Sequence, residues 1–240
     1  MADDDKARDA QAQWPAYMAQ RAQQAQDARL KGFFAAWTLA PSTPLAEVPL
    51  VGLDIETTGL VADSHSIVSI GTVPFTLDRI LFSRRRHWLL KPRFALEQRS
   101  VTLHHITHSD LAEAPDLNEV LAEVLEALAG RLPVVHYRNI ERSFIESAVQ
   151  YRLGESLLFP VIDTMALEAR FHRQRPLARL RQWLGRQPVS IRLHQSRQRY
   201  GLPAYLPHHA VIDALATAEL FQAQVAAHLR PDKPVGELWC

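Results

Sequence analysis

The stretch that decides the fold is Val51-Gly-Leu-Asp-Ile-Glu-Thr-Thr-Gly-Leu60. Asp54 and Glu56 stand two residues apart at the end of an apolar run, and residues i and i+2 of a strand point to the same face. Both acids should therefore face one side of a sheet, with Ile55 turned into the core. Because like charges repel, the pair calls for a cation, and carboxylate oxygens suit Mg²⁺ or Mn²⁺. A solvated strand end followed by a turn is the plainer alternative.

The composition is that of an ordinary globular protein, with 240 residues of which 47% are hydrophobic and 22% charged. The formal net charge is +1, which favours a partner gripped locally at one end over a duplex gripped along its length. Cys240 is the single cysteine, so one chain cannot form a disulfide framework or a cysteine zinc site. No apolar run approaches the length of a membrane span, and the first residues lack a hydrophobic signal segment. We therefore expect a cytoplasmic protein without membrane contact.

The chain is expected to consist of a helical N-terminal extension and one larger domain. Residues from about Ala7 to Trp37 are rich in Ala, Gln and Arg, which favour helix, and prolines then mark a linker. We assign 1–45 to this extension and linker, 46–230 to the domain, and 231–240 to a C-terminal tail. Packing of the extension on the domain is the preferred interpretation, and docking of a polymerase or another protein partner is the alternative.

Hydrophobic periodicity predicts the elements of the domain. Strands are expected at 49–54, 66–73, 79–90, 132–136 and 158–163, and helices at 117–128, 140–152, 178–200 with a break at Pro188, and 210–229. Early strands followed by alternating strands and helices predict an α/β fold, in which a mixed sheet is flanked by helices on both faces.

A second group of polar residues surrounds the start of the last expected helix. His208 and Asp213 lie five residues apart, so His208 must sit on the preceding loop to face the same cleft as Asp213. A carboxylate in this apolar segment is costly unless it is paired, hydrogen-bonded or metal-bound. A solvent-facing Asp and a capping-loop His are the plainer alternatives. Glu141 is expected in the first turn of the helix after 132–136, where the helix dipole favours an acid in any case.

Together these segments resemble the DnaQ-like 3′-5′ exonucleases of the DEDDh type. Asp54-Ile-Glu56-Thr-Thr-Gly matches the first motif of that family, and His208…Asp213 followed by Ala-Leu-Ala-Thr-Ala-Glu-Leu-Phe matches its third. The resemblance extends over about Val48 to Ala226 and implies an RNase H-like fold.

Two further segments resemble the family less closely. Residues 136–145 are similar to a degenerate second motif, in which Glu141 replaces the third acidic Asp of the family. Residues 101–115 are similar to its His-Gly-Ile-Thr segment, with His105 in place of Gly. Glu keeps the charge but reaches one methylene further, so Glu141 would bind metal, weaken the activity or tune it to another substrate.

The resemblance implies a chemistry and a set of roles. Asp54, Glu56, Glu141 and Asp213 would bind two Mg²⁺ or Mn²⁺ ions, and His208 would act as the general base. The enzyme would release nucleoside 5′-monophosphates from the 3′ ends of single-stranded DNA or RNA.

The same resemblance implies that Thr57 and Leu60 would contact the terminal nucleotide. Arg138 and Arg142 would meet backbone phosphates, although exposed arginines at a helix start are more often only solvated.

Two alternatives stay open at this point. The first is a weakly active or inactive exonuclease-fold module that binds nucleic acid or a polymerase, and the second is an exoribonuclease for short RNA. His104, His105 and His108 lack a second ligand cluster for zinc, and Arg84-Arg85-Arg86 is more typical of a solvated strand end than of a phosphate site.

Overall fold

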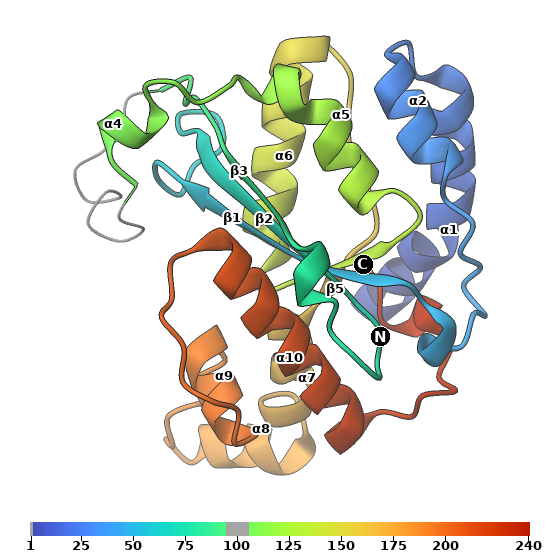
Figure 1. Cartoon of the computed structure of the whole chain (residues 1–240). Coiled ribbons are helices and arrows are strands. Elements are labelled where there is room, and N and C mark those ends of the chain that lie inside the picture. The colour runs from blue at the N-terminus through green and yellow to red at the C-terminus, as the bar shows by residue number, and fades with distance from the viewer. Residues whose placement is uncertain (1, 95–105) are drawn as a thin grey trace.

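The computed structural model describes residues 2–94 and 106–240, and a mixed sheet forms the centre of these residues (Figure 1). Its strand order is β3-β2-β1-β4-β5. β1 pairs antiparallel with β2 and parallel with β4, β2 pairs antiparallel with β3, and β4 parallel with β5. The strands are β1 Leu50–Thr57, β2 Ile67–Phe75, β3 Arg86–Leu89, β4 Leu132–Val135 and β5 Ile162–Asp163. The predicted mixed α/β sheet is confirmed.

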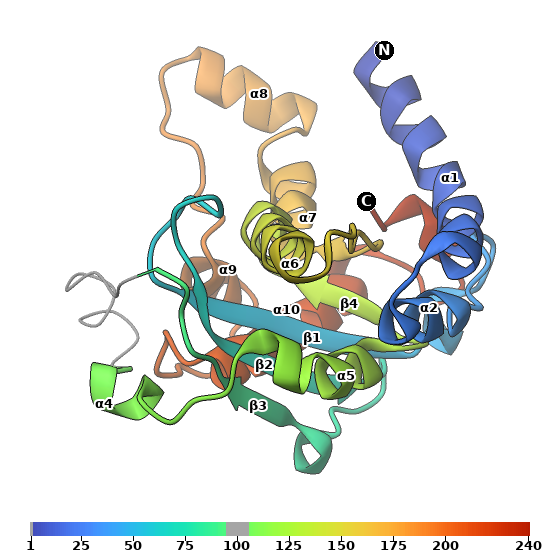
Figure 2. The same cartoon turned by 90° about the horizontal axis from the view of Figure 1, so that it is seen from above.

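Helices cover both faces of this sheet, and alternation along β1 assigns its side chains to them (Figure 2). Val51, Leu53 and Ile55 are buried in one core cluster with α5 (Leu117–Leu128) and α6 (Arg138–Leu153). Leu50 joins a second cluster with Ala218 and Phe221 of α10 (Ala210–His228). Because successive strand residues face opposite sides, Asp54 and Glu56 lie on the α10 face, and Ile55 is in the core as predicted.

Two glycines allow α10 to lie directly against the sheet. Gly52 and Gly71 stand on the central strands β1 and β2, and Gly71 is the cross-strand partner of Asp54. A Cβ added at Gly52 would lie 2.4 Å from the Ala214 carbonyl oxygen, and one at Gly71 would lie 2.2 Å from the Ala210 carbonyl carbon. Any larger residue would therefore displace the helix start that carries Asp213.

The N-terminal extension folds onto the domain. It forms α1 (Ala2–Gln24) and α2 (Ala28–Ala35), and Leu30, Phe33 and Phe34 of α2 are buried. The Phe33 ring meets the Phe159 ring edge to face, with 5.8 Å between the centroids. This packing is the arrangement that the sequence analysis preferred.

The expected linker and the expected C-terminal tail pair with each other. Pro44 and Pro234 form an antiparallel bridge, and the Leu45 N–H donates to the Lys233 carbonyl at 2.9 Å. At the very end of the chain, Trp239 is fully buried, and its ring lies 5.7 Å from that of Trp37. Residues 231–240 thus contribute to the core.

The chain between β5 and α10 differs most from the expected elements. α7 (Thr164–His172) was not predicted. The helix expected at 178–200 with a break at Pro188 is present as α8 (Pro176–Trp183) and α9 (Leu193–Arg199), and Pro188 lies in the longer non-helical stretch between them. The strand expected at 158–163 keeps only Ile162–Asp163, because the Val161 backbone bonds to Cys240. The third expected strand is divided into a 3₁₀ turn at Phe82–Arg84 and the short β3.

The remaining helix α4 (His108–Leu111) begins with a capping box formed by Thr107 and Asp110. Of the helices that the structure describes, none has the length and apolar character needed to cross a bilayer.

Candidate active site

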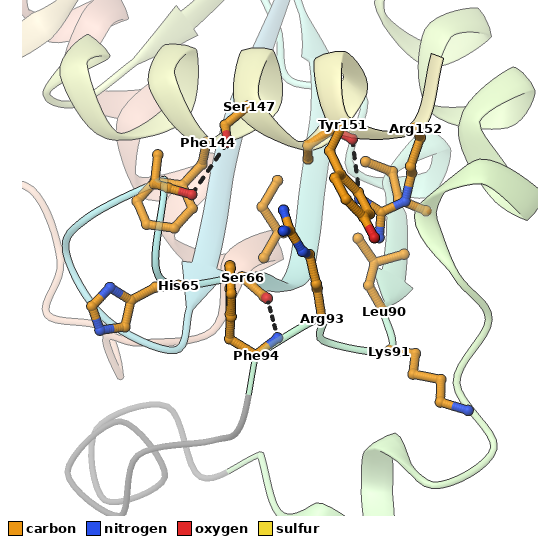
Figure 3. A pocket seen from close by; sticks show the side chains of 14 residues that line it. His65, Ser66, Leu90, Lys91, Arg93, Phe94, Phe144, Ser147, Tyr151 and Arg152 are labelled. Atoms are coloured by element: carbon orange, nitrogen blue, oxygen red, sulfur yellow. Dashed lines mark hydrogen bonds between the residues drawn. The ribbon is translucent and has the colours of Figure 1, made fainter. Parts of the chain in front are cut away.

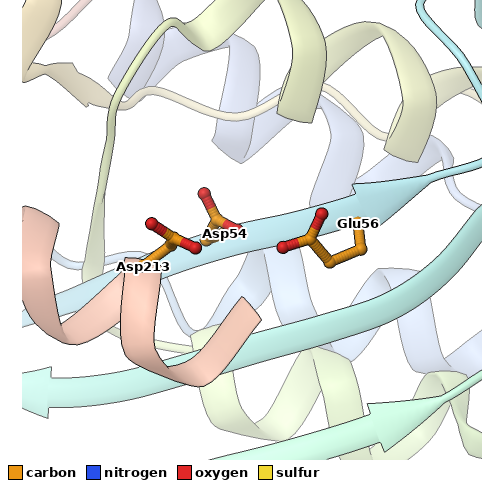
Figure 4. A group of neighbouring side chains, drawn as sticks. All are labelled: Asp54, Glu56 and Asp213. Atoms are coloured by element: carbon orange, nitrogen blue, oxygen red, sulfur yellow. The ribbon is translucent and has the colours of Figure 1, made fainter. Parts of the chain in front are cut away.

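Three carboxylates from two distant parts of the chain converge at the end of β1 (Figure 4). Asp54 and Glu56 extend from β1, and Asp213 extends from the first turn of α10. One carboxylate oxygen from each lies within 4.8 Å of those of the other two. The predicted convergence of these three side chains is therefore present in the structure.

The protein environment disfavours the charged forms of all three groups. Burial, followed by the charges of Asp213, Glu56 and Glu141, raises the pKa of Asp54 well above its usual range. Burial and the charge of Asp213 raise the pKa of Glu56 to about 8. Burial also raises the pKa of Asp213. Buried carboxylates crowded together are ionised at neutral pH only when a positive charge compensates them, so this group calls for a cation.

Among the side chains that the structure describes, no Lys or Arg supplies this charge, because none forms an ion pair with Asp54, Glu56 or Asp213. Their oxygens have the hardness and the mutual spacing that a divalent cation requires of its ligands. The residues present thus fit a metal ion.

Backbone and side-chain donors hold Asp213 in place. Its Oδ2 accepts hydrogen bonds from the backbone N–H of His208 at 2.6 Å and of His209 at 3.1 Å. The Tyr205 hydroxyl also bonds to this carboxylate, and these donors partly offset the effect of burial on the pKa of Asp213. His208 adopts a left-handed backbone with φ of 69°, so the loop before α10 is bent around the carboxylate.

His208 lies on the loop before α10, as its spacing predicted, and its side chain is exposed. With His209 it lines a pocket of about 280 Å³ that also reaches His87 and Ser69. The rings of His209 and His87 lie 4.8 Å apart, and His87 Nε2 lies 2.8 Å from the Ser69 hydroxyl. β2 and β3 thereby brace the loop that presents His208.

Glu141 lies beside the three carboxylates without joining their group. It is buried in the first turn of α6, its Oε2 has no hydrogen-bond partner, and burial raises its pKa well above the usual range. Its charge raises the pKa of Asp54, so the two carboxylates interact electrostatically. A buried carboxylate oxygen without a donor is costly, and a cation or its bound water would satisfy it.

Asp163 supports the position of Glu141 and was missed by the sequence analysis. Its carboxylate accepts the backbone N–H of Tyr137 at 3.1 Å and of Arg138 at 3.2 Å, just before Glu141. It also caps α7, accepting from Met165 N–H at 2.9 Å. Tyr137 is left-handed, with φ of 89°, so Asp163 stabilises an unusual turn. An Asp between a buried run and a helix is a typical N-cap, and this signal was available in the sequence.

The residues expected to bind substrate differ in how exposed they are and in whether other residues already bond to them. Leu60, just beyond the end of β1, is 81% exposed, and the Thr57 hydroxyl donates to the Gly59 carbonyl at 2.6 Å. Arg138 forms an ion pair with Asp163 at 3.4 Å and keeps part of its surface exposed. Arg142 bonds to the Phe159 and Cys240 carbonyls, so its guanidinium serves the fold.

His104 and His105, with residues 101–105 of the 101–115 segment, lie outside the described residues. His108 is exposed on α4, and Arg84, Arg85 and Arg86 are exposed beside β3. These positions are consistent with the solvated role expected for the three arginines.

A small cavity on the other face of the sheet does not compete with this site (Figure 3). It lies between Phe94, Tyr151 and the start of β2, and its volume is about 30 Å³, the space of about one water molecule. Ile67 and Phe144 in its wall belong to the core cluster opposite Asp54.

Two acids on the central strand β1 meet an acid on the helix that packs against the same face of the sheet. This arrangement is that of a metal-dependent hydrolase of the RNase H-like α/β class. The family model described as Exonuclease (RNase T) matches residues 51–221. The chain belongs to this family of exonucleases, which is the family that the motifs implied.

Its relatives differ greatly in length. The DNA polymerase III subunit epsilon of Treponema pallidum is 29% identical over 184 residues, which cover 76% of this chain and 79% of that protein. The PolC-type DNA polymerase III of Thermotoga maritima is also 29% identical over 76% of this chain, but the match covers only 12% of that protein. The chain thus spans most of one relative and about a tenth of the other.

Solved structures share the fold at low sequence identity. The nuclease domain of 3′hExo, described as a DEDDh family member bound to rAMP, superposes with a TM-score of 0.60 at 14% identity. The match covers 76% of this chain and 94% of that domain. The RNase H-like architecture is therefore confirmed.

Proposed function

We propose that this exonuclease removes nucleoside 5′-monophosphates one at a time from single-stranded 3′ ends, with Mg²⁺ or Mn²⁺ bound by its carboxylates. The observation that carries the proposal is the convergence of Asp54, Glu56 and Asp213, whose oxygens approach within 4.8 Å without a protein cation between them.

The four acids would divide between two ions. Asp54, Glu56 and Asp213 would hold the first, and Asp54 with Glu141 the second, since Glu141 interacts electrostatically with Asp54 but stands outside the group of three. When bound, such ions polarise the phosphodiester and make an attacking water more acidic.

His208 would accept the proton of the attacking water, because histidine is the commonest general base in enzymes. Its loop is fixed to Asp213 by the 2.6 Å hydrogen bond from the His208 backbone N–H. The water oxygen forms a new bond to the last internucleotide phosphorus. The bond from that phosphorus to the 3′ oxygen of the preceding nucleotide breaks, and this oxygen leaves with a proton as the new 3′ hydroxyl. Leu60, exposed just beyond the end of β1, would contact the terminal base.

The direct test uses an oligonucleotide labelled at its 5′ end. With Mg²⁺ or Mn²⁺ we expect a ladder that shortens from the 3′ end, and no shortening with a chelator. His208→Ala should slow the reaction by about 10²-fold or more, in the range of general-base catalysis. A wild-type protein that leaves the strand intact under all these conditions would disprove the proposal.

The proposed reaction applies to both deoxyribose and ribose in the substrate. One relative is a subunit of a DNA polymerase and one structural neighbour was bound to rAMP, and no described residue is assigned to a 2′ hydroxyl. Single-stranded DNA and short RNA of equal length should be compared under the same metal conditions. A rate ratio above about tenfold in favour of RNA would select the exoribonuclease alternative.

The degenerate second motif favours a second candidate, a module with weak or no catalysis. Glu141→Asp and Glu141→Gln separate the two. If Glu141 binds metal, Gln should lower the rate by about 10²-fold, and Asp should keep it within about tenfold. A rate that rises strongly with Asp would indicate a weakened site, and a rate unchanged by Gln would remove Glu141 from the site.

A polymerase is a possible protein partner, because two relatives are polymerase III proteins. The N-terminal extension uses Met18, Leu30, Phe33 and Phe34 to contact its own domain. A partner bound there would therefore have to recognise its outer, more polar surface.

A further inference from the structure

The chain between α7 and α10 carries a concentration of positive charge that the net charge conceals. Residues 169–212, here called the arginine segment, contain nine arginines and neither Asp nor Glu among 44 residues. The other 18 basic residues share the remainder of the chain with all 26 acidic ones. The overall charge of +1 therefore combines a cationic segment with an acidic remainder.

Part of this charge faces solvent without a counter-charge. Arg175, Arg179, Arg186 and Arg192 are exposed, and none of them forms an ion pair with an acid that the structure describes. In contrast, Arg197 and Arg199 are paired with Glu219 and Glu168 and hold the segment in place. The segment thus contains arginines that attach it to the domain and exposed arginines without an ion pair among the described residues.

The same segment exposes large apolar side chains. Trp183 is 81% exposed, Leu184 64% and Leu180 51%. They lie on or just after α8, which stands outermost, beyond α7 and away from the sheet (Figure 2). Arg179 and Trp183 are four residues apart, and such residues are neighbours on one helix face. A guanidinium beside a bare indole offers a phosphate contact next to a stacking surface.

The arginine segment is joined directly to the acidic site. The Ile191 carbonyl lies 3.1 Å from His136 Nε2, at the end of β4 and close before Glu141. Further along, Tyr205 bonds to Asp213. A ligand on the segment would therefore approach the carboxylates from the α8 side.

We propose that the arginine segment binds the single strand upstream of the 3′ end, with Arg175, Arg179 and Arg186 contacting phosphates and Trp183 stacking on a base. This inference rests on the proposed function and adds to it a preference for long strands. Metal ions held by the carboxylates would act on the last phosphodiester only, so attraction for the rest of the strand must come from other residues. Backbone charge dominates the affinity of such complexes. Exposed aromatic residues favour unpaired bases over a duplex, whose bases are stacked already.

The test compares Arg175→Gln/Arg179→Gln/Arg186→Gln with a matched control, Arg84→Gln/Arg85→Gln/Arg86→Gln. The control removes the same charge from an exposed run beside β3, far from α8 in Figure 2. Binding of a fluorescent 12-nucleotide strand is measured by anisotropy without divalent metal, over a series of salt concentrations. Hydrolysis of the 12-mer and of a dinucleotide is measured with Mg²⁺.

The segment variant should raise the Kd for the 12-mer by about tenfold or more. It should also reduce the slope of log K against log salt by about 2, since each phosphate contact on a single strand contributes about 0.7. Trp183→Ala alone should weaken binding by about fivefold or more. Dinucleotide hydrolysis should stay within about twofold in both variants, and the control should change 12-mer binding by less than about threefold.

Three results would overturn the inference: equal effects of the two triple variants, equal losses on dinucleotide and 12-mer, or wild-type binding to anionic phospholipid vesicles but not to the strand. If the wild type hydrolyses neither substrate, the proposed function fails, and the anisotropy comparison still decides whether the segment binds a strand. Circular dichroism of each variant separates misfolding from lost contacts.

Discussion

The acidic site and the arginine segment are opposite in charge and in construction. Asp54, Glu56, Glu141 and Asp213 come from positions spread over some 160 residues and meet in a largely buried place where their pKa values rise. The arginines lie within 44 consecutive residues, and several of them face solvent. Buried like charges are held together only by tightly packed surroundings, whereas exposed cations need only to lie on the surface near the site. The first region should therefore be sensitive to small changes of packing, and the second to salt and to substrate length.

The largest expected effect is that of Asp54→Asn. It removes a ligand from the centre of the acidic group, so hydrolysis of the dinucleotide and of the 12-mer should both fall by about 10³-fold or more. Because it also removes a repelling buried charge, the metal-free variant should melt at or above the wild-type Tm. Calorimetry checks this, and a lowered Tm would mean that the lost activity reflects damaged folding.

Gly71→Ala tests the framework of the acidic site. The new methyl group would lie 2.2 Å from the backbone of Ala210, so α10 must shift and carry Asp213 away from Asp54. We expect about a 10²-fold loss of activity and about 1–3 kcal/mol of destabilisation.

Gly32→Ala is the matched control for that change, because a Cβ at this position of α2 meets nothing within 4 Å. It should stabilise the helix by about 0.5–1 kcal/mol and leave activity unchanged. Equal effects of the two substitutions, measured by urea unfolding and by assay, would contradict the framework interpretation.

Tyr205→Phe tests the junction between the two regions. It removes the hydroxyl that bonds to Asp213 and keeps the ring, whose centroid lies 4.9 Å from the Arg197 guanidinium. Loss of a hydrogen bond that orients a metal ligand typically costs 10–100-fold, so we expect about a tenfold lower rate. The apparent Kd for Mg²⁺ should rise as well. Tyr151→Phe, at an exposed tyrosine on α6, is the control and should change neither quantity.

The smallest expected effect is the change of folding stability with pH. The pKa of Glu56 is about 8 in the folded, metal-free protein against an ordinary value of 4.5. The folded state then binds more protons than the unfolded state between these values, so stability should fall as pH rises from about 4.5 to about 8. A loss of about 1 kcal/mol would lower Tm by about 2–4 °C.

A divalent cation replaces those protons, so its stabilising effect should grow with pH. Tm values with a chelator and with Mg²⁺, measured from pH 5.5 to 8.5, check both trends. A Tm gain from Mg²⁺ that is constant over this range would show that the carboxylates are already ionised without metal.

Local patterns in the sequence were sufficient for the parts of the fold that have strong periodicity. β1, α5 and α10 appear close to their predicted bounds, and the two-residue spacing of Asp54 and Glu56 placed both on one face. The run before β5 misled the prediction, since its apolar residues are buried against Trp239 and Cys240 instead of extending the sheet. Such pairing with the far end of the chain leaves no local signal.

The sequence by itself determined the family and the accumulation of arginine in 169–212, and it predicted the four acids and His208 as site residues, because these depend on residue type and spacing. The tertiary structure alone decided that Gly52 and Gly71 let α10 lie close to β1, that Tyr205 and Asp163 support the carboxylates, and that Arg142 serves the fold. The physical reason is the separation along the chain over which each interaction acts. Strand and helix periods are fixed by the local backbone, whereas close approach and hydrogen bonding between distant residues arise only when the whole chain is packed.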